Sequence, residues 1–125
     1  MEFVKEKIKE IMTKTIEQNR VLKCDDIANA DHFKMFMGSD PSNVFKLLGF
    51  NCCSYMCTYN DKKSVVVFFS VPINEKTTTK TSYEKVIELV KNLEENLITL
   101  DYITTKESKE EKQVYLTLIK SVPTQ

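Results

Sequence analysis

An unbroken apolar run from Val65 to Phe69 constrains the fold of this chain more than any other stretch. Three β-branched valines precede two phenylalanines, and so short a run without a polar position is typical of a strand covered on both faces of its sheet. Pro72 ends the pairing, because proline has no backbone N–H to donate to a neighbouring strand. We therefore expect a buried strand over about 64–71.

A helix with one apolar stripe is expected to follow this strand. Thr81 and Glu84 have the spacing of a capping box, in which each side chain accepts a backbone N–H from the start of the helix. Apolar residues then recur at helical spacing, at Val86, Leu89, Val90, Leu93 and Leu97. These signals predict a helix over about 82–96 and, directly after it, a strand over about 97–103. The strands that flank this helix should be parallel neighbours joined by a right-handed crossover.

Helices are also expected in the first part of the chain. Apolar residues spaced by three or four, with lysine and glutamate between them, predict an amphipathic helix over about 2–19. Asp25 and Asp26 can cap a second helix over about 25–37, which Gly38 and Pro41 would end. The stretch 42–50 fits either a short helix or a buried loop.

The remaining strands complete an expected sheet. Alternating residues predict a strand over about 53–59, paired as a hairpin with 64–71 across the polar residues 60–63. A strand over about 113–120 follows a charged segment, 105–112, that fits a loop or a short exposed helix. The expected fold is therefore one α/β domain over residues 1–125, with a mixed four-stranded sheet (hairpin plus β-α-β) flanked by helices.

Composition and motifs argue against an enzyme. The formal net charge is zero, so no overall field attracts nucleic acid or an anionic membrane. The chain has no P-loop, no Gly-x-Ser-x-Gly elbow and no Rossmann glycine pattern, and its only histidine is His32. Cys24, Cys52, Cys53 and Cys57 lack metal-site spacing and are expected to be buried reduced thiols. We expect no metal, cofactor, small-molecule substrate or membrane span, and the charged N-terminus predicts an intracellular protein.

A resemblance to a known family lies in the order and separation of four groups of residues. They are Lys7-Ile8-Lys9 with Ile11-Met12, Cys24-Asp25-Asp26-Ile27, Phe33-Lys34 with Gly38-Ser39-Asp40-Pro41-Ser42, and Val67-Phe68-Phe69 with Pro72, Lys80-Thr81 and Tyr83. In these groups the chain resembles the N-terminal jaw domain of the fifth shared subunit of eukaryotic nuclear RNA polymerases. The chain ends before that family's C-terminal docking domain, and Thr105-Lys106-Glu107-Ser108 lacks the proline of the family's Thr-Pro-Ser turn.

The resemblance implies a non-catalytic subunit of a DNA-dependent RNA polymerase, with a nuclease-like outline but without catalytic residues. Its implied partners are the large polymerase subunits and, through phosphate contacts, downstream duplex DNA. Lysines at the ends of predicted elements are the candidates for these contacts: Lys76, Lys80, Lys106 and Lys109. The implied location is the nucleus, or the cytoplasm for a viral or plasmid-encoded polymerase. This assignment depends on 64–71 and 97–103 being neighbours in one sheet.

Two alternatives belong to other classes of protein. Phe33 and the segment Leu47-Leu48-Gly49-Phe50, followed by a hairpin and a helix, are similar to a PUB domain, which binds the C-terminal tail of an AAA ATPase. That alternative requires the segments 97–103 and 113–120 to be helical or disordered, because PUB domains are mostly helical. The other alternative is a viral or plasmid-encoded interaction protein with no nucleic-acid contact, which the zero net charge suits.

Overall fold

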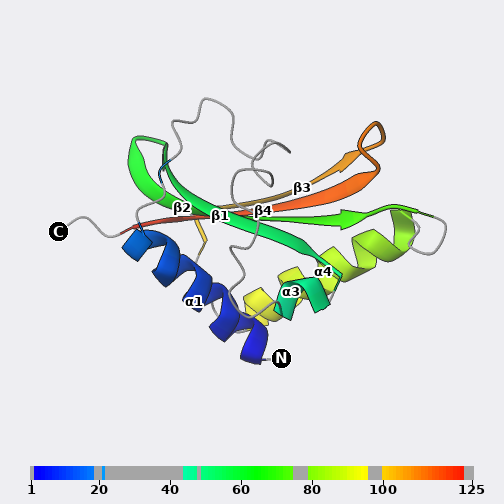
Figure 1. The fold of residues 1–125 in the computed structure, drawn as a ribbon, viewed down its shortest axis with the longest axis horizontal. Coiled ribbons are helices and arrows are strands. Elements are labelled where there is room, and N and C mark those ends of the chain that lie inside the picture. The colour runs from blue at the N-terminus through cyan, green and yellow to red at the C-terminus, as the bar shows by residue number, and fades with distance from the viewer. Residues whose placement is uncertain are drawn as a thin grey trace.

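The computed structural model describes residues 2–18, 21, 44–47, 49–74, 79–95 and 100–122. Its helices and strands follow the chain in the order α1 (Glu2–Gln18), α3 (Val44–Leu47), β1 (Asn51–Tyr59), β2 (Lys62–Pro72), α4 (Thr79–Glu95), β3 (Tyr102–Ser108) and β4 (Gln113–Ser121). The strands form one four-stranded sheet, and α1, α3 and α4 lie on the same side of it (Figure 1). The predicted helix over 25–37 lies outside the described residues.

The apolar run Val65 to Phe69 forms the centre of β2, as predicted. β2 pairs with β1 on one side and with β4 on the other, and every side chain of the run is buried. The predicted strand over 113–120 is also confirmed, since β4 covers it and buries its apolar residues. The expected α/β class is therefore correct, with β2 as an inner strand.

The predicted mixed sheet, with 64–71 and 97–103 as parallel neighbours, is wrong. The sheet order is β1-β2-β4-β3, and all neighbouring pairs are antiparallel. β3 begins at Tyr102, and residues 97–99 of the predicted strand lie outside the described residues. β2 and β3 run in the same direction, because both are antiparallel to β4, but β4 lies between them. The physical reason is burial. The apolar residues of β4 gain more from the inner position than the polar strand β3, which takes the edge.

The predicted β1–β2 hairpin is confirmed, with a tighter turn than the four polar residues suggested. Tyr59 pairs directly with Lys62, so the loop contains only Asn60 and Asp61. Both loop residues have positive φ, 50° and 61°, which is the conformation of a type I′ turn. Asn and Asp tolerate this left-handed region better than most residues, and its twist matches that of the paired strands.

The helices follow the predictions with two differences. α1 matches the expected helix, and 44–47 is a single helical turn, which decides between the alternatives for 42–50. α4 begins at Thr79, so Thr81 lies inside the helix and the predicted capping box at its start is wrong. Instead, the Ser82 hydroxyl donates a hydrogen bond to the Pro72 carbonyl at 3.0 Å. This bond ties the first part of α4 to the end of β2.

The core occupies both faces of the sheet. On the helix side, α1 and α4 pack against β1, β2 and β4, and the Phe69 ring meets Phe45 and Phe50 edge-on at centroid distances of 4.9 and 5.9 Å. On the opposite face the buried residues are Cys53, Tyr55, Cys57, Val66, Phe68, Tyr115 and Ile119. Cys52, Cys53 and Cys57 are buried thiols of β1, as predicted, whereas Cys24 lies outside the described residues. Of the four strands, β3 is the one whose residues are least buried.

Candidate functional site

The candidate site is β3, the strand at one edge of the sheet. β3 pairs only with β4 among the described strands, and all of its residues are exposed or half-buried. Tyr102 and Ile103 are the most apolar of them and remain 41% and 40% exposed. The two side chains lie on opposite faces of the strand, so each face of this open edge carries one exposed apolar side chain that an added strand could cover.

The direction of the backbone groups of β4 follows from its pairing with β2. The Val122 N–H donates to the Lys63 carbonyl and the Ile73 N–H donates to the Lys112 carbonyl, each at 2.8 Å. Both bonds join directly opposed residues in the same register. Because backbone groups alternate in direction along an antiparallel pair, even-numbered residues of β4 face β2 and odd-numbered residues face β3.

The outward groups of β3 can be assigned from this alternation. Tyr115 and Thr117 of β4 lie opposite Lys106 and Thr104, so the even-numbered residues of β3 direct their N–H and C=O groups to β4. The odd-numbered residues Ile103, Thr105 and Glu107 therefore direct theirs away from the sheet. This row of donors and acceptors is the hydrogen-bonding pattern that another strand would need.

Contacts at both ends hold β3 in place. At its start, the Asp101 N–H donates to the Ile119 carbonyl at 2.9 Å, and the Asp101 carboxylate accepts the Ser121 N–H. The bond from Ser121 lowers the pKa of Asp101 below its ordinary value. At its end, the Ser108 hydroxyl accepts the Glu111 N–H at 3.3 Å within the turn to β4. The strand is thus presented in a fixed register rather than as a loose segment.

Aromatic side chains lie beside β3 on the sheet face opposite the helices. The rings of Tyr102 and Tyr59 are 5.6 Å apart between centroids, and those of Tyr115 and Phe68 are 5.2 Å apart. The Tyr115 hydroxyl donates to the Glu111 carboxylate, and burial together with that carboxylate raises the pKa of Tyr115. Tyr115 is therefore a neutral, structural phenol at physiological pH.

The predicted phosphate-contact lysines are only partly brought together. Lys106 lies on β3 and Lys109 in the following turn, and both are exposed. Lys80 lies in the first turn of α4, which the bonds at Pro72 and Ile73 place at the same end of the sheet, whereas Lys76 lies outside the described residues.

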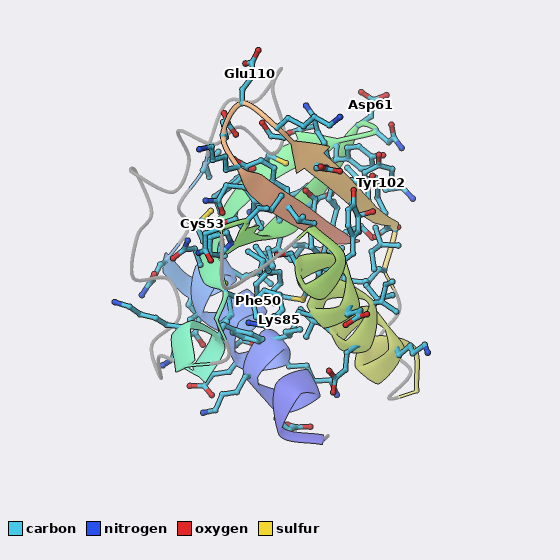
Figure 2. The ribbon with its side chains drawn as sticks, turned by 90° about the vertical axis from the view of Figure 1, so that its right-hand side faces the viewer. Phe50, Cys53, Asp61, Lys85, Tyr102 and Glu110 are labelled. Carbon is cyan, nitrogen blue, oxygen red and sulfur yellow. The ribbon has the colours of Figure 1, made fainter. Side chains whose placement is uncertain are left out.

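The turn that follows β3 carries as many acids as bases. Lys109 and Lys112 lie in it with Glu110 and Glu111, and Lys106 and Glu107 precede it in β3. Figure 2 shows Glu110 projecting from the turn. A phosphate backbone is attracted by a local excess of positive charge, and this turn has none. The geometry therefore adds no support for DNA contact here.

The described part of the chain offers neither a metal-binding cluster nor a membrane-spanning helix. No group of three or more His, Cys, Asp or Glu residues is placed there to hold a metal ion. No helix in the described part of the chain is long and apolar enough to cross a membrane. Comparisons with protein-family models, with curated proteins and with solved structures found no significant match.

The sequence prediction missed β3 as a site because it placed the strand too early. In the described part of 97–103, Leu100 packs against the core and the strand begins at Tyr102. The usable signal was the alternation in 102–107, where Ile103 and Glu107 share one face while Tyr102 and Lys106 share the other. A strand with one apolar and one charged residue on each face is suited to an edge.

Proposed function

We propose that this protein is a non-catalytic protein-interaction module, which joins a larger assembly when an extended segment of a partner adds to the open edge of β3. The observation that carries the proposal is the exposed edge itself: Ile103, Thr105 and Glu107 direct backbone donors and acceptors outward from a strand fixed at both ends. Strand addition of this kind supplies main-chain hydrogen bonds for affinity and alternate side chains for specificity.

The two edges of the sheet differ in a way that supports β3 as the docking edge. At the β1 edge, Val21 already forms a parallel bridge with Met56. At the β3 edge, no described residue forms such a bridge, and the strand contains no proline that would block pairing. Lys106 is the basic residue of β3 that discourages indiscriminate pairing.

The polymerase-subunit role names one such assembly, and it stays a prediction from the sequence. The parallel adjacency of 64–71 and 97–103, on which this role depended, is absent. The remaining support for the role is the spacing of the quoted motifs. The nuclease-like outline belongs to the same prediction. The PUB-like alternative required helix or disorder where the chain forms β4 and part of β3, so its condition is not met.

The test is copurification of the tagged chain from its source cells, with two variants at one position. Thr105→Pro removes one outward N–H, and the pairing with β4 does not use that group. Thr105→Val keeps the N–H and serves as the matched control. We expect wild type and Thr105→Val to recover the same partner and Thr105→Pro to lose it.

The identity of the recovered partner separates the candidate assemblies. Large RNA polymerase subunits would support the polymerase role, and an AAA ATPase would support the PUB-like alternative. A partner retained equally by Thr105→Pro would show that β3 is not the docking edge. For DNA contact, gel-shift titration at low salt is the direct measurement, because phosphate-driven binding is strongest there.

A further inference from the structure

The side chains of β3 specify the partner segment more closely than the open edge alone, and this inference rests on the proposed function. Ile103, Thr105 and Glu107 lie on the helix side of the sheet, whereas Tyr102, Thr104 and Lys106 lie on the opposite side. An added antiparallel strand would place one side chain beside each of them on the same face.

A second copy of this chain is a poor occupant of the edge. Hydrogen-bonded self-pairing requires odd-numbered residues opposite odd-numbered residues, because only these direct their backbone groups outward. The register centred on Thr105 places Ile103 opposite Glu107 of the second copy. The register centred on Thr104 places Tyr102 opposite Lys106, and the one centred on Lys106 places that lysine opposite itself. Each of these registers apposes like charges or an apolar residue with a charge. The register centred on Ile103 avoids this, but it leaves Lys106 and Glu107 without an opposite charge across the pair.

We propose that the β3 edge binds an extended segment of another protein with the pattern basic, acidic, two β-branched residues, aliphatic, aromatic, read from its N-terminus. In antiparallel addition the basic residue lies beside Glu107 and the acidic residue beside Lys106. The aliphatic and aromatic residues then cover Ile103 and Tyr102, the exposed apolar side chains of the strand. The acid beside Lys106 occupies a non-hydrogen-bonded pair, in which side chains approach most closely.

The probe is a fluorescently labelled peptide with the core Lys-Glu-Thr-Thr-Val-Phe between short Gly-Ser flanks. The control peptide exchanges the first two residues, giving Glu-Lys-Thr-Thr-Val-Phe, with the same composition and backbone. Two attractive cross-strand pairs become two like-charged pairs, so the wild-type protein should bind the control about tenfold more weakly by anisotropy titration. The double variant Lys106→Glu with Glu107→Lys should reverse this preference. Both substituted side chains lie on the surface strand, so the fold should be retained.

Amide hydrogen exchange locates the binding. The N–H groups of Ile103, Thr105 and Glu107 should exchange rapidly in the free protein and become protected when the Lys-Glu peptide is added. Thr105→Pro should abolish peptide binding, and Thr105→Val should keep it. A preference that reverses in the charge-exchanged variant, with protection at these amides, supports the proposal.

Three results would overturn it. Equal affinity of the wild-type protein for the two peptides would mean that β3 does not discriminate by charge, and absence of binding to either would remove this partner pattern. A dimer seen by light scattering and lost in Thr105→Pro would make a second copy the occupant. None of these results alters the copurification test, so the failure of this inference and the failure of the proposed function can be told apart.

Discussion

The hydroxyl oxygens of Thr15 in α1 and Ser54 in β1 lie 2.6 Å apart, and both side chains are fully buried. Thr15 also lies 2.7 Å from the Ile11 carbonyl, to which it donates its only hydroxyl proton. Ser54 must therefore donate to Thr15. This bond connects the first helix with the first strand across 39 residues of sequence, inside an otherwise apolar layer.

Thr15→Val should destabilise the protein by about 1–2 kcal/mol, because the buried hydroxyl–hydroxyl bond is lost while the shape is kept. Chemical denaturation of Thr15→Val, Ser54→Ala and the double variant measures the coupling between the two residues. We expect the double variant to be less destabilised than the sum of the single variants by about 1 kcal/mol. Additive effects would show that the bond does not contribute to stability.

Phe69→Ala should cost about 3–5 kcal/mol, because it removes a fully buried ring that meets two other aromatic rings. The matched control is Ile87→Ala in α4, whose side chain is half exposed. That substitution should change the free energy of unfolding by less than about 0.5 kcal/mol. Similar losses for the two variants in thermal or urea unfolding would contradict the described helix-side core.

Asp61→Gly should stabilise the β1–β2 hairpin by up to about 1 kcal/mol, because glycine is favoured at the second position of a type I′ turn.

The opposite effect, a loss of stability, is expected for Gly49→Ala. Gly49 has a φ of 92°, a backbone conformation that L side chains rarely adopt, so alanine is strained there even though the flexible Lys85 side chain can move away from the added Cβ. Melting temperatures of the two variants should therefore move in opposite directions from that of the wild type.

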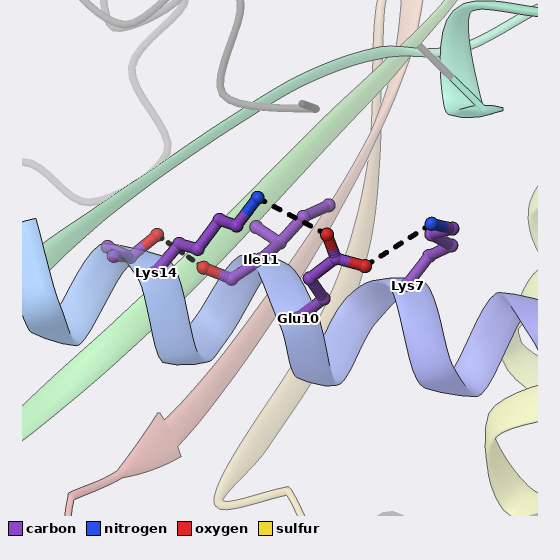
Figure 3. Close-up of polar contacts among 5 residues, drawn as sticks. Lys7, Glu10, Ile11 and Lys14 are labelled. Carbon is purple, nitrogen blue, oxygen red and sulfur yellow. Dashed lines mark hydrogen bonds and ion pairs between the residues drawn. The ribbon is translucent and has the colours of Figure 1, made fainter. Parts of the chain in front are cut away.

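Acid should weaken two surface carboxylate contacts. Ser121 holds the pKa of Asp101 below its ordinary value, and hydrogen bonds from Lys7 and Lys14 do the same for Glu10 (Figure 3). A lowered folded-state pKa contributes stability above the unfolded value, about 3.9 for Asp, which is lost as the pH falls through the folded value. Asp101→Asn should therefore lower stability at pH 7 and flatten its dependence on pH in acid. An unchanged acid slope in urea unfolding would contradict the contact at Ser121.

Local patterns predicted the elements better than their arrangement. The apolar run Val65 to Phe69 was sufficient to place β2, because a strand apolar on both faces has few alternatives to an inner position. The position of β3 was not readable in the same way. It depends on the competition between β4 and β3 for the place beside β2, and that competition is decided by burial across the whole sheet. The candidate site follows from this strand order, whereas the sequence pattern placed the strand after α4 directly beside β2.

The direction of the β3 backbone groups can be tested by proline substitution at adjacent positions. The N–H of Thr104 faces β4, so Thr104→Pro should break a ladder hydrogen bond, whereas Thr105→Pro removes an N–H that faces solvent. We expect Thr104→Pro to be the less stable variant by at least about 1 kcal/mol in urea unfolding. Both variants carry the same ring constraint on φ, so they differ in the ladder hydrogen bond and in the removed side chain, which is half-buried at Thr104 and exposed at Thr105. If Thr105→Pro were the more damaging change, the outward row would consist of the even-numbered residues, and a partner strand would have to pair with Thr104 and Lys106 instead.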